Sequence, residues 1–93
     1  MKLSLEWDER KAAANLRKHR VSFEEARTIF SDPLLWTFPD EEHSAAEERY
    51  VSIGVSAVGK ILVVVHTDRA GAVRLISSRR ATAAERRFYE EGK

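Results

Sequence analysis

Alternating hydrophobic and polar positions run through three segments of the chain, Lys2–Trp7, Tyr50–Ser56 and Val73–Arg80. Strict alternation predicts β-strands with one buried face. Between the last two segments lies an apolar run, Ile61–Val65, which is typical of a central strand. Turns around Gly59 and Gly71 separate these runs, so this half of the chain predicts a three-stranded antiparallel meander. Leu34–Phe38 is a further strand candidate without a clean period.

Helical spacing of apolar residues appears in three other segments, each preceded by a capping residue. Asp8 is placed to cap a helix over Glu9–His19. Capping boxes at Ser22–Glu25 and Thr82–Glu85 predict a second helix that ends at Phe30 and a last helix that ends at Gly92. The order of elements predicts one domain over residues 1–93, an α+β fold in which an antiparallel sheet is packed by two N-terminal helices and one C-terminal helix. One sheet face should stay open or be covered by a partner.

Charge is divided unevenly between the two halves of the chain. Residues 1–48 hold 7 Lys and Arg against 11 Asp and Glu, and residues 49–93 hold 9 against 4, which gives net charges of −4 and +5. Basic residues gather in Arg10–Arg20 and Arg69–Arg87, which favours a local anionic target. The chain has no cysteine and no apolar stretch long enough to span a bilayer, so we expect a cytoplasmic protein with no membrane contact.

The sequence resembles the BrnT toxins over nearly its whole length. The segments that carry the resemblance are Asp8–His19, Val21–Ala26, Glu48–Tyr50, Ile53–Gly54, Arg74–Thr82, Glu85–Arg86 and Tyr89. Two positions depart from the family pattern, because Arg20 stands where the family usually has glycine and His66 where it usually has tyrosine. Arg20 would be strained if the turn after the first helix needs a left-handed residue.

The resemblance implies a RelE-like ribonuclease fold and a toxin of a type II toxin–antitoxin system that inhibits translation by cleaving RNA. It also implies neutralisation by a BrnA-like antitoxin with a DNA-binding, ribbon-helix-helix domain. The toxin would then be found in an oligomer with its antitoxin. It would reach operator DNA only through that complex, which represses its own operon.

Metal-free RNA cleavage needs a group to accept the 2′-hydroxyl proton, a group to protonate the leaving 5′-oxygen, and cations for the phosphate. Arginine suits the last task because its planar fork binds two phosphate oxygens at once. We predict catalytic roles for four residues: His19, Arg79, Arg80 and Tyr89. Arg79 and Arg80 should point in opposite directions from a strand end, one of them toward an open groove. His19 could instead cap its helix, and Tyr89 could pack in the core or stack on a base.

Six further residues are predicted to bind RNA: Lys11, Asn15, Lys18, Arg49, Arg74 and Ser77. No cofactor is expected. A metal site is also not expected, because His19, His43 and His66 lack the close spacing of a local zinc site. The alternative function is a non-catalytic nucleic-acid-binding or protein-binding module, since basic strands and aromatic residues serve binding as readily as cleavage.

Overall fold

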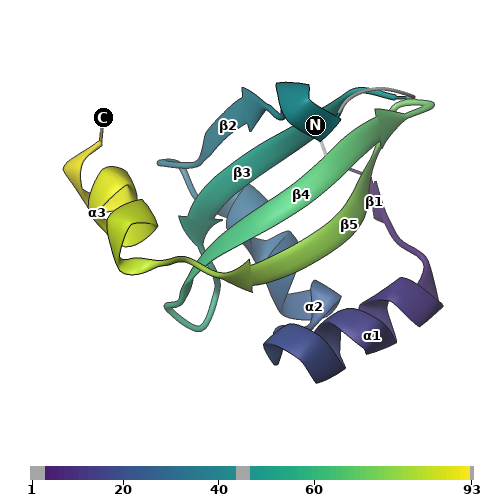
Figure 1. Cartoon of the computed structure of the whole chain (residues 1–93), viewed down its shortest axis with the longest axis horizontal. Helices are drawn as coiled ribbons and strands as arrows, with labels where there is room; N and C mark the ends of the chain where they lie inside the picture. Colours follow the sequence, from purple (N-terminus) through teal and green to yellow (C-terminus); the bar gives the residue numbers. More distant parts are fainter. Residues whose placement is uncertain (1–3, 44–46, 93) are drawn as a thin grey trace.

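A five-stranded sheet forms the centre of the computed structural model, which describes residues 4–43 and 47–92 (Figure 1). The strands are β1 (Leu5–Glu6), β2 (Trp36–Pro39), β3 (Arg49–Val55), β4 (Ile61–Arg69) and β5 (Ala72–Arg80), and their order in the sheet is β1-β5-β4-β3-β2. The antiparallel meander β3–β4–β5 is confirmed, and β2 adds to it antiparallel. The expectation of a purely antiparallel sheet is wrong, because the short β1 pairs parallel to β5. Lys2 and Leu3 of the predicted first strand lie outside the described residues.

Helices α1 (Glu9–His19) and α2 (Phe23–Ala26) cover one face of the sheet, and α3 (Ala83–Glu91) stands beside one end of it (Figure 1). Asp8 caps α1 and a complete capping box at Thr82 begins α3, both as predicted. The second predicted helix is shorter than expected, since after Ala26 the chain tightens into the 3₁₀ segment η1 (Arg27–Ser31). A second 3₁₀ segment, η2 (Glu41–His43), follows β2.

The capping box predicted at Ser22 forms only in part. The Ser22 hydroxyl accepts from the Glu25 amide at 3.0 Å, but the Glu25 carboxylate accepts from the Ser56 hydroxyl at 2.8 Å instead of closing the box. The Thr28 hydroxyl donates to the Glu25 carbonyl and so competes with the regular helical bond there, which accounts for the early end of α2. Among the described residues, no helix is long and apolar enough to cross a membrane.

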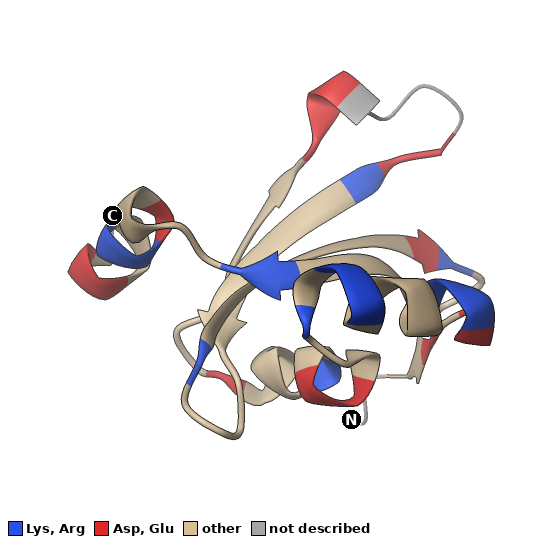
Figure 2. Ribbon diagram, turned by 60° about the horizontal axis from the view of Figure 1, so that its bottom comes forward, with Lys and Arg blue, Asp and Glu red and all other residues tan. Residues whose placement is uncertain are grey.

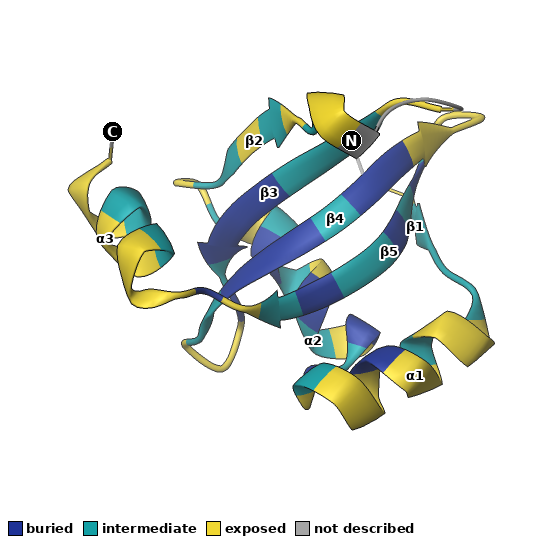
Figure 3. Cartoon of the chain, in the orientation of Figure 1, coloured by how far each residue is buried: buried dark blue, intermediate teal, exposed yellow. Residues whose placement is uncertain are grey.

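The main hydrophobic core lies between the sheet and the pair α1 and α2, and the opposite sheet face is less covered (Figure 3). Its central members are Val21, Phe23, Ala26, Ile29, Leu62, Val64, Val73 and Leu75. Each large side chain buried there stabilises the fold by about 1.5–3 kcal/mol. The sequence predicts that the opposite face stays open or is covered by a partner, but the structure covers part of it with α3. Ile53 and Val63 are 3% and 4% exposed on that face, in a smaller cluster packed by Phe88 and Tyr89. We call this side of the sheet, away from α1 and α2, the open face.

A β-bulge changes which residues of β5 share a face. Val65 pairs with Ser77 and the next residue, His66, pairs with Leu75, so Ile76 is an extra residue without a partner on β4. A bulge shifts the alternation of side chains by one position. Simple alternation along β5 would have put Ser77 on the face of Leu75, and the structure corrects this expectation.

The bulge brings Arg74 to the open face together with Ser77 and Arg79, because these residues pair with the open-face positions of β4. Arg80 pairs with Leu62 of the core, and so it belongs to the face that carries the helices. Arg79 and Arg80 therefore point in opposite directions, as predicted from their adjacent positions on a strand end.

Asn15 of α1 takes the place of a neighbouring strand along the outer edge of β5. Its Oδ1 accepts from the Ser78 amide at 3.0 Å, and its Nδ2 donates to the carbonyls of Ser78 and Val21, both at 2.9 Å. β1 pairs only with Val73 and Arg74, so Asn15 satisfies backbone groups that β1 does not reach. The C-terminal half of α1 is thereby fixed against the end of β5 (Figure 2).

The two departures from the BrnT pattern have clear structural settings. Arg20 ends α1 in the left-handed conformation with φ 60°, which costs a non-glycine residue about 1 kcal/mol. His66 is buried, with its Nε2 at 2.7 Å from the Ser52 hydroxyl and its ring stacked on Tyr50. Burial lowers the pKa of His66, so its imidazole is held neutral on the helical side of the sheet.

Substituting Asn15→Ala should lower the free energy of unfolding by about 2–4 kcal/mol, because the buried backbone groups of Ser78 and Val21 lose their partners. Urea denaturation followed by circular dichroism measures the loss. Arg17→Ala, an exposed change on the same helix, should stay within about 0.5 kcal/mol of the wild type. Equal stability of the two variants would show that the Asn15 contacts do not hold α1 to β5.

Candidate active site

The strand register arranges the open face of the sheet in rows that run across the strands. Three neighbouring rows form the site, in the order Arg49–Thr67–Arg74, Phe38–Val51–Val65–Ser77 and Trp36–Ile53–Val63–Arg79. The middle strands contribute apolar side chains to the last two rows, and β5 contributes the polar ones. The face is therefore an apolar floor bordered by arginines.

A groove of about 500 Å³ lies over this floor. Its floor is formed by Val51, Ile53, Val63 and Val65, and its sides by Phe38, Asp40, Ser77, Arg79, Ala84, Glu85 and Phe88. Phe88 of α3 packs on Trp36 and Phe38, with ring centroids 5.2 and 6.4 Å away, so β2 and α3 close one side together. A groove of this size and lining has room for a small organic ligand.

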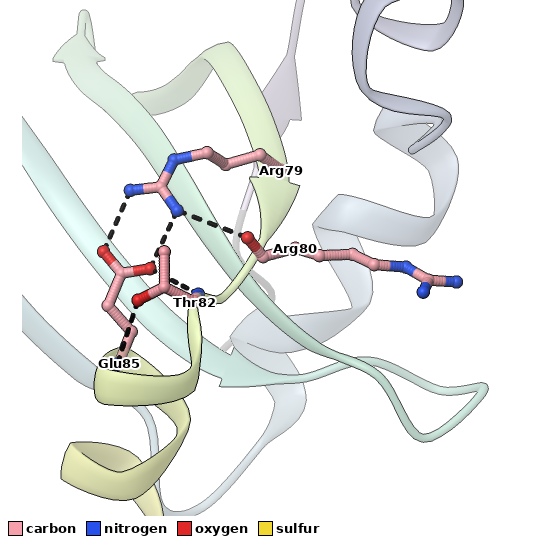
Figure 4. Close-up of polar contacts among 4 residues, drawn as sticks. All are labelled: Arg79, Arg80, Thr82 and Glu85. Atoms are coloured by element: carbon pink, nitrogen blue, oxygen red, sulfur yellow. Dashed lines mark hydrogen bonds and ion pairs between the residues drawn. The ribbon is translucent and has the colours of Figure 1, made fainter.

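Arg79 and Glu85 form a two-pronged ion pair at the edge of this groove (Figure 4). Nη1 and Nη2 of Arg79 donate to the two carboxylate oxygens of Glu85 at 2.8 and 2.9 Å, and Nη1 also donates to the Arg80 carbonyl. Glu85 is itself fixed, since its Oε1 accepts from the Thr82 amide at 2.8 Å. The guanidinium is thus held in one orientation by the first turn of α3.

The ion pair keeps both groups charged over a wide pH range. The bond to Arg79 lowers the pKa of Glu85 to about 2, and burial opposes this shift only in part. The same bond raises the pKa of Arg79 above its ordinary value. Glu85 is therefore a poor proton acceptor near neutral pH, because a carboxylate of such low pKa holds a proton weakly.

One edge of the Arg79 guanidinium remains available. Within the part of the chain that the structure describes, its Nε and the second hydrogen of Nη2 have no acceptor, and Figure 4 shows this edge turned away from Glu85. The Ser77 hydroxyl lines the same groove and makes no hydrogen bond to a described residue. A guanidinium edge and a hydroxyl so placed can both donate to an anion such as phosphate.

Of the predicted site residues, Ser77, Arg79, Arg74 and Arg49 share the open face. Arg74 donates to Glu6 at 3.0 Å and lies in the row farthest from Arg79. Arg49 also has a polar or electrostatic partner in the structure. Strand geometry places Arg74 about 13 Å and Arg49 about 16 Å from Arg79, so they border the far end of the face instead of sharing one phosphate with Arg79.

The remaining predicted cations lie on the helical side of β5. Lys11 and Lys18 are exposed on α1, His19 is its last residue, and Arg80 extends from β5 toward that side (Figures 2 and 4). No strand flanks β5 between Leu75 and Arg80 on its outer side, because β1 ends earlier. The two predicted groups therefore lie on either side of one sheet edge and do not meet in a single pocket.

Two predicted residues have positions that favour structural roles. Asn15 is 6% exposed and its amide is fully bonded to the backbone, so the expectation that it contacts RNA does not fit this geometry. The Tyr89 hydroxyl donates to Asp32, and burial together with that carboxylate raises the pKa of Tyr89 to about 12. Tyr89 is also absent from the groove lining, so it is placed to hold α3 and not to accept a proton in the groove.

Sequence reasoning considered Glu85 as a possible base but preferred a role as a helix cap, and it did not single out Phe38 or Phe88 as site residues. The capping box was visible in the sequence, but the ion pair to Arg79 depends on the turn of the chain between β5 and α3. Phe88 was visible as an apolar helix position, and only the sheet order shows that it faces β2 across the groove.

Comparison with known proteins identifies the family. Residues 7–85 match the family model described as the ribonuclease toxin BrnT of type II toxin–antitoxin systems. The chain belongs to the BrnT family. Its fold is similar to the crystal structure of the Brucella abortus ribonuclease toxin BrnT, with a TM-score of 0.68 and 25% sequence identity over 87% of this chain and 99% of that chain. No curated protein matches the sequence. As a BrnT family member, the chain comes from a class of ribonuclease toxins that act with an antitoxin.

The Glu85 ion pair predicts a defined pH dependence of stability. Because the folded state holds the pKa near 2 against an ordinary value of 4.5, the stabilisation is present above pH 4.5 and is lost as the pH falls toward 2. Urea denaturation at several pH values should show wild type more stable than Glu85→Gln at pH 6, with the difference shrinking below pH 4.5. Glu90→Gln, an exposed change on α3, serves as the control. A wild-type advantage that stays constant down to pH 2 would contradict the ion pair.

Proposed function

We propose that this chain is itself an endoribonuclease toxin that cleaves RNA without a metal ion, with Arg79 as the principal phosphate-binding residue. The observation that carries the proposal is the Arg79 guanidinium, which Glu85 fixes at the edge of a groove while its Nε and Nη2 edge stays available. Ser77 on the same strand face supplies a second donor. The described residues contain no group of three or more metal-ligating side chains.

In the proposed reaction the 2′-hydroxyl oxygen of RNA attacks the adjacent phosphorus, and the bond from phosphorus to the 5′-oxygen breaks. The 2′-hydroxyl loses its proton to a base and the leaving 5′-oxygen gains one from an acid, which yields a cyclic phosphate and a 5′-hydroxyl. The phosphate carries extra negative charge in the transition state. Arg79 stabilises that charge because its donors are fixed before the reaction begins.

His19 is the candidate proton carrier in this proposal. Imidazole is the side chain that ordinarily titrates closest to neutral pH, whereas Glu85 holds a proton weakly and the Tyr89 hydroxyl is bound to Asp32. His19 and Arg80 lie on the opposite side of β5 from Arg79. The proposal therefore requires the RNA strand to wrap around the outer edge of β5, so that the phosphodiester bound by Arg79 comes within reach of His19. Lys18 and Lys11 extend this cationic surface along α1, so they would bind flanking phosphates.

The partner in this proposal is a BrnA-like antitoxin with a ribbon-helix-helix domain, which would bind the operator DNA for both proteins. RNA cleavage in the cytoplasm would inhibit translation until the antitoxin covers the toxin. The support is the family itself, whose members belong to type II toxin–antitoxin systems. We also propose that the fold is RelE-like. The support is its antiparallel meander, which is packed by two N-terminal helices and one C-terminal helix.

Substituting Arg79→Ala should reduce RNA cleavage by about 10²–10³-fold, because the transition-state charge loses its fixed donors. Arg79→Lys should recover little, since a lysine cannot present two fixed donors. The measurement is cleavage of a synthetic RNA by purified protein in the presence of EDTA. Arg27→Ala removes the same charge from an exposed position at the start of η1 and serves as the matched control.

Two results would contradict the proposal. Full activity of Arg79→Ala would remove this residue from the site. Wild-type protein that binds RNA in EDTA but leaves it intact would favour the alternative, a non-catalytic nucleic-acid-binding module.

Glu85 acts through Arg79, and a pair of variants separates this positioning role from helix capping. Glu85→Gln should lower kcat by about tenfold with little change in KM, because a mobile guanidinium is less well oriented toward the transition state. Thr82→Ala removes the hydroxyl half of the capping box but leaves the ion pair, so it should keep nearly full kcat. Equal losses of kcat in the two variants would show that Glu85 matters only as a cap.

A further inference from the structure

The groove on the open face has two chemically different halves. At β5 it presents the available edge of Arg79 and the Ser77 hydroxyl, which are donors for an anion. Over β4 and β3 it presents the side chains of Val65 and Val51, bordered by the ring of Phe38. A ligand that fits both halves must join an anionic group to a flat apolar surface.

We propose that this groove is a subsite for one unpaired nucleotide, with its phosphate on Arg79 and Ser77 and its base on the floor formed by Val51 and Val65. Neighbouring strands are about 4.8 Å apart, so a base attached to a phosphate above β5 lies above β4 and β3. The inference rests on the proposed function and deepens it, because it names the form of RNA that the site accepts.

Size and the unused donors of Arg79 favour a nucleotide over an apolar protein segment. Two carboxylates also line the groove, but Glu85 is paired with Arg79, and Asp40, which follows β2, has a partner of its own. The groove of about 500 Å³ matches a small ligand with one apolar and one charged part. An apolar segment lying across the floor would cover the Nε and Nη2 donors of Arg79 without supplying acceptors, which is costly for a charged group. A phosphate satisfies those donors while Glu85 keeps its own two bonds.

The subsite requires single-stranded RNA at the bound position. In an A-form duplex each base is stacked on its neighbours and paired, so no base face can lie on a protein surface. A base in a loop or an unstacked strand can turn out of its stack and rest on Val51, Val65 and the edge of Phe38 or Phe88. Contacts with a base face are made by every nucleobase, so the subsite selects the unpaired state more than a particular base.

The direct test is binding of a 2′-O-methyl RNA tetranucleotide, which lacks the attacking hydroxyl and cannot be cleaved. The protein carries ¹³C-labelled valine methyl groups, and the probe is compared with the same tetranucleotide containing one abasic residue at each position in turn. We expect the methyl signals of Val51 and Val65 to shift with the complete probe. Of the four abasic probes, the one that lacks the base bound in the subsite should bind about tenfold more weakly than the complete probe and should not produce these shifts.

Two tryptophan variants complete the test. Val65→Trp fills the floor and should weaken binding of the complete probe by about tenfold, with no further loss for the abasic probe. Val58→Trp introduces the same side chain at an exposed position of the turn between β3 and β4, and should bind like wild type.

Several results would overturn the subsite. These are an absence of binding, equal binding of complete and abasic probes, or methyl shifts that spare Val51 and Val65. Wild-type affinity of Val65→Trp would also overturn it. Because the probe is not cleaved, the outcome does not depend on catalysis. If the protein cleaves ordinary RNA but binds the complete and abasic probes equally, only the subsite is refuted. If the protein binds the probes as expected but does not cleave ordinary RNA, only the ribonuclease proposal is refuted.

Discussion

The bidentate ion pair between Arg79 and Glu85 connects the fold of this protein to its chemistry. It joins the end of β5 to the first turn of α3, at donor–acceptor distances of 2.8 and 2.9 Å. A guanidinium has five N–H donors. In Arg79 two of them bind Glu85 and a third binds the Arg80 carbonyl. The same contact therefore positions α3, holds the arginine in one orientation, and leaves one edge of the guanidinium available, which is the edge that we propose binds phosphate.

The outer edge of β5 is the second constraint on the site. Asn15 pairs with the backbone of Ser78 where a further strand would otherwise lie, so α1 ends close to this edge. The bulge at Ile76 then brings Ser77 and Arg79 to the open face, while Arg80 remains on the side of α1. Under the proposed function, an RNA strand lying across this edge would meet cationic groups on both sides. The predicted residues on the two faces would then contact one substrate at different points along its strand.

The sequence correctly predicted most of the local elements but extended the second helix to Phe30, where the structure has α2 only to Ala26. Contacts between distant segments account for most of what the sequence did not reveal. Capping residues placed α1 and α3 correctly because the Asp8 and Thr82 contacts are made within a few residues. The parallel pairing of β1, the bulge at Ile76 and the burial of Asn15 depend on segments far apart in the chain, so no local pattern signals them. The same limit applies to the site. Arg79 was found from its position at a strand end, whereas its bond to Glu85 and the groove beside it depend on how the chain turns before α3.

The central claim is that Arg79 binds phosphate through its Nε and Nη2 edge while Glu85 remains bound to it. NMR of the arginine side-chain nitrogens and the glutamate carboxylate carbons, recorded while an uncleavable 2′-O-methyl RNA is added, measures both contacts at once. We expect the Arg79 Nε signal to shift and the Glu85 carboxylate signal to stay nearly constant. An unchanged Arg79 signal, or a Glu85 signal that moves to the position of a carboxylate released into water, would contradict the claim.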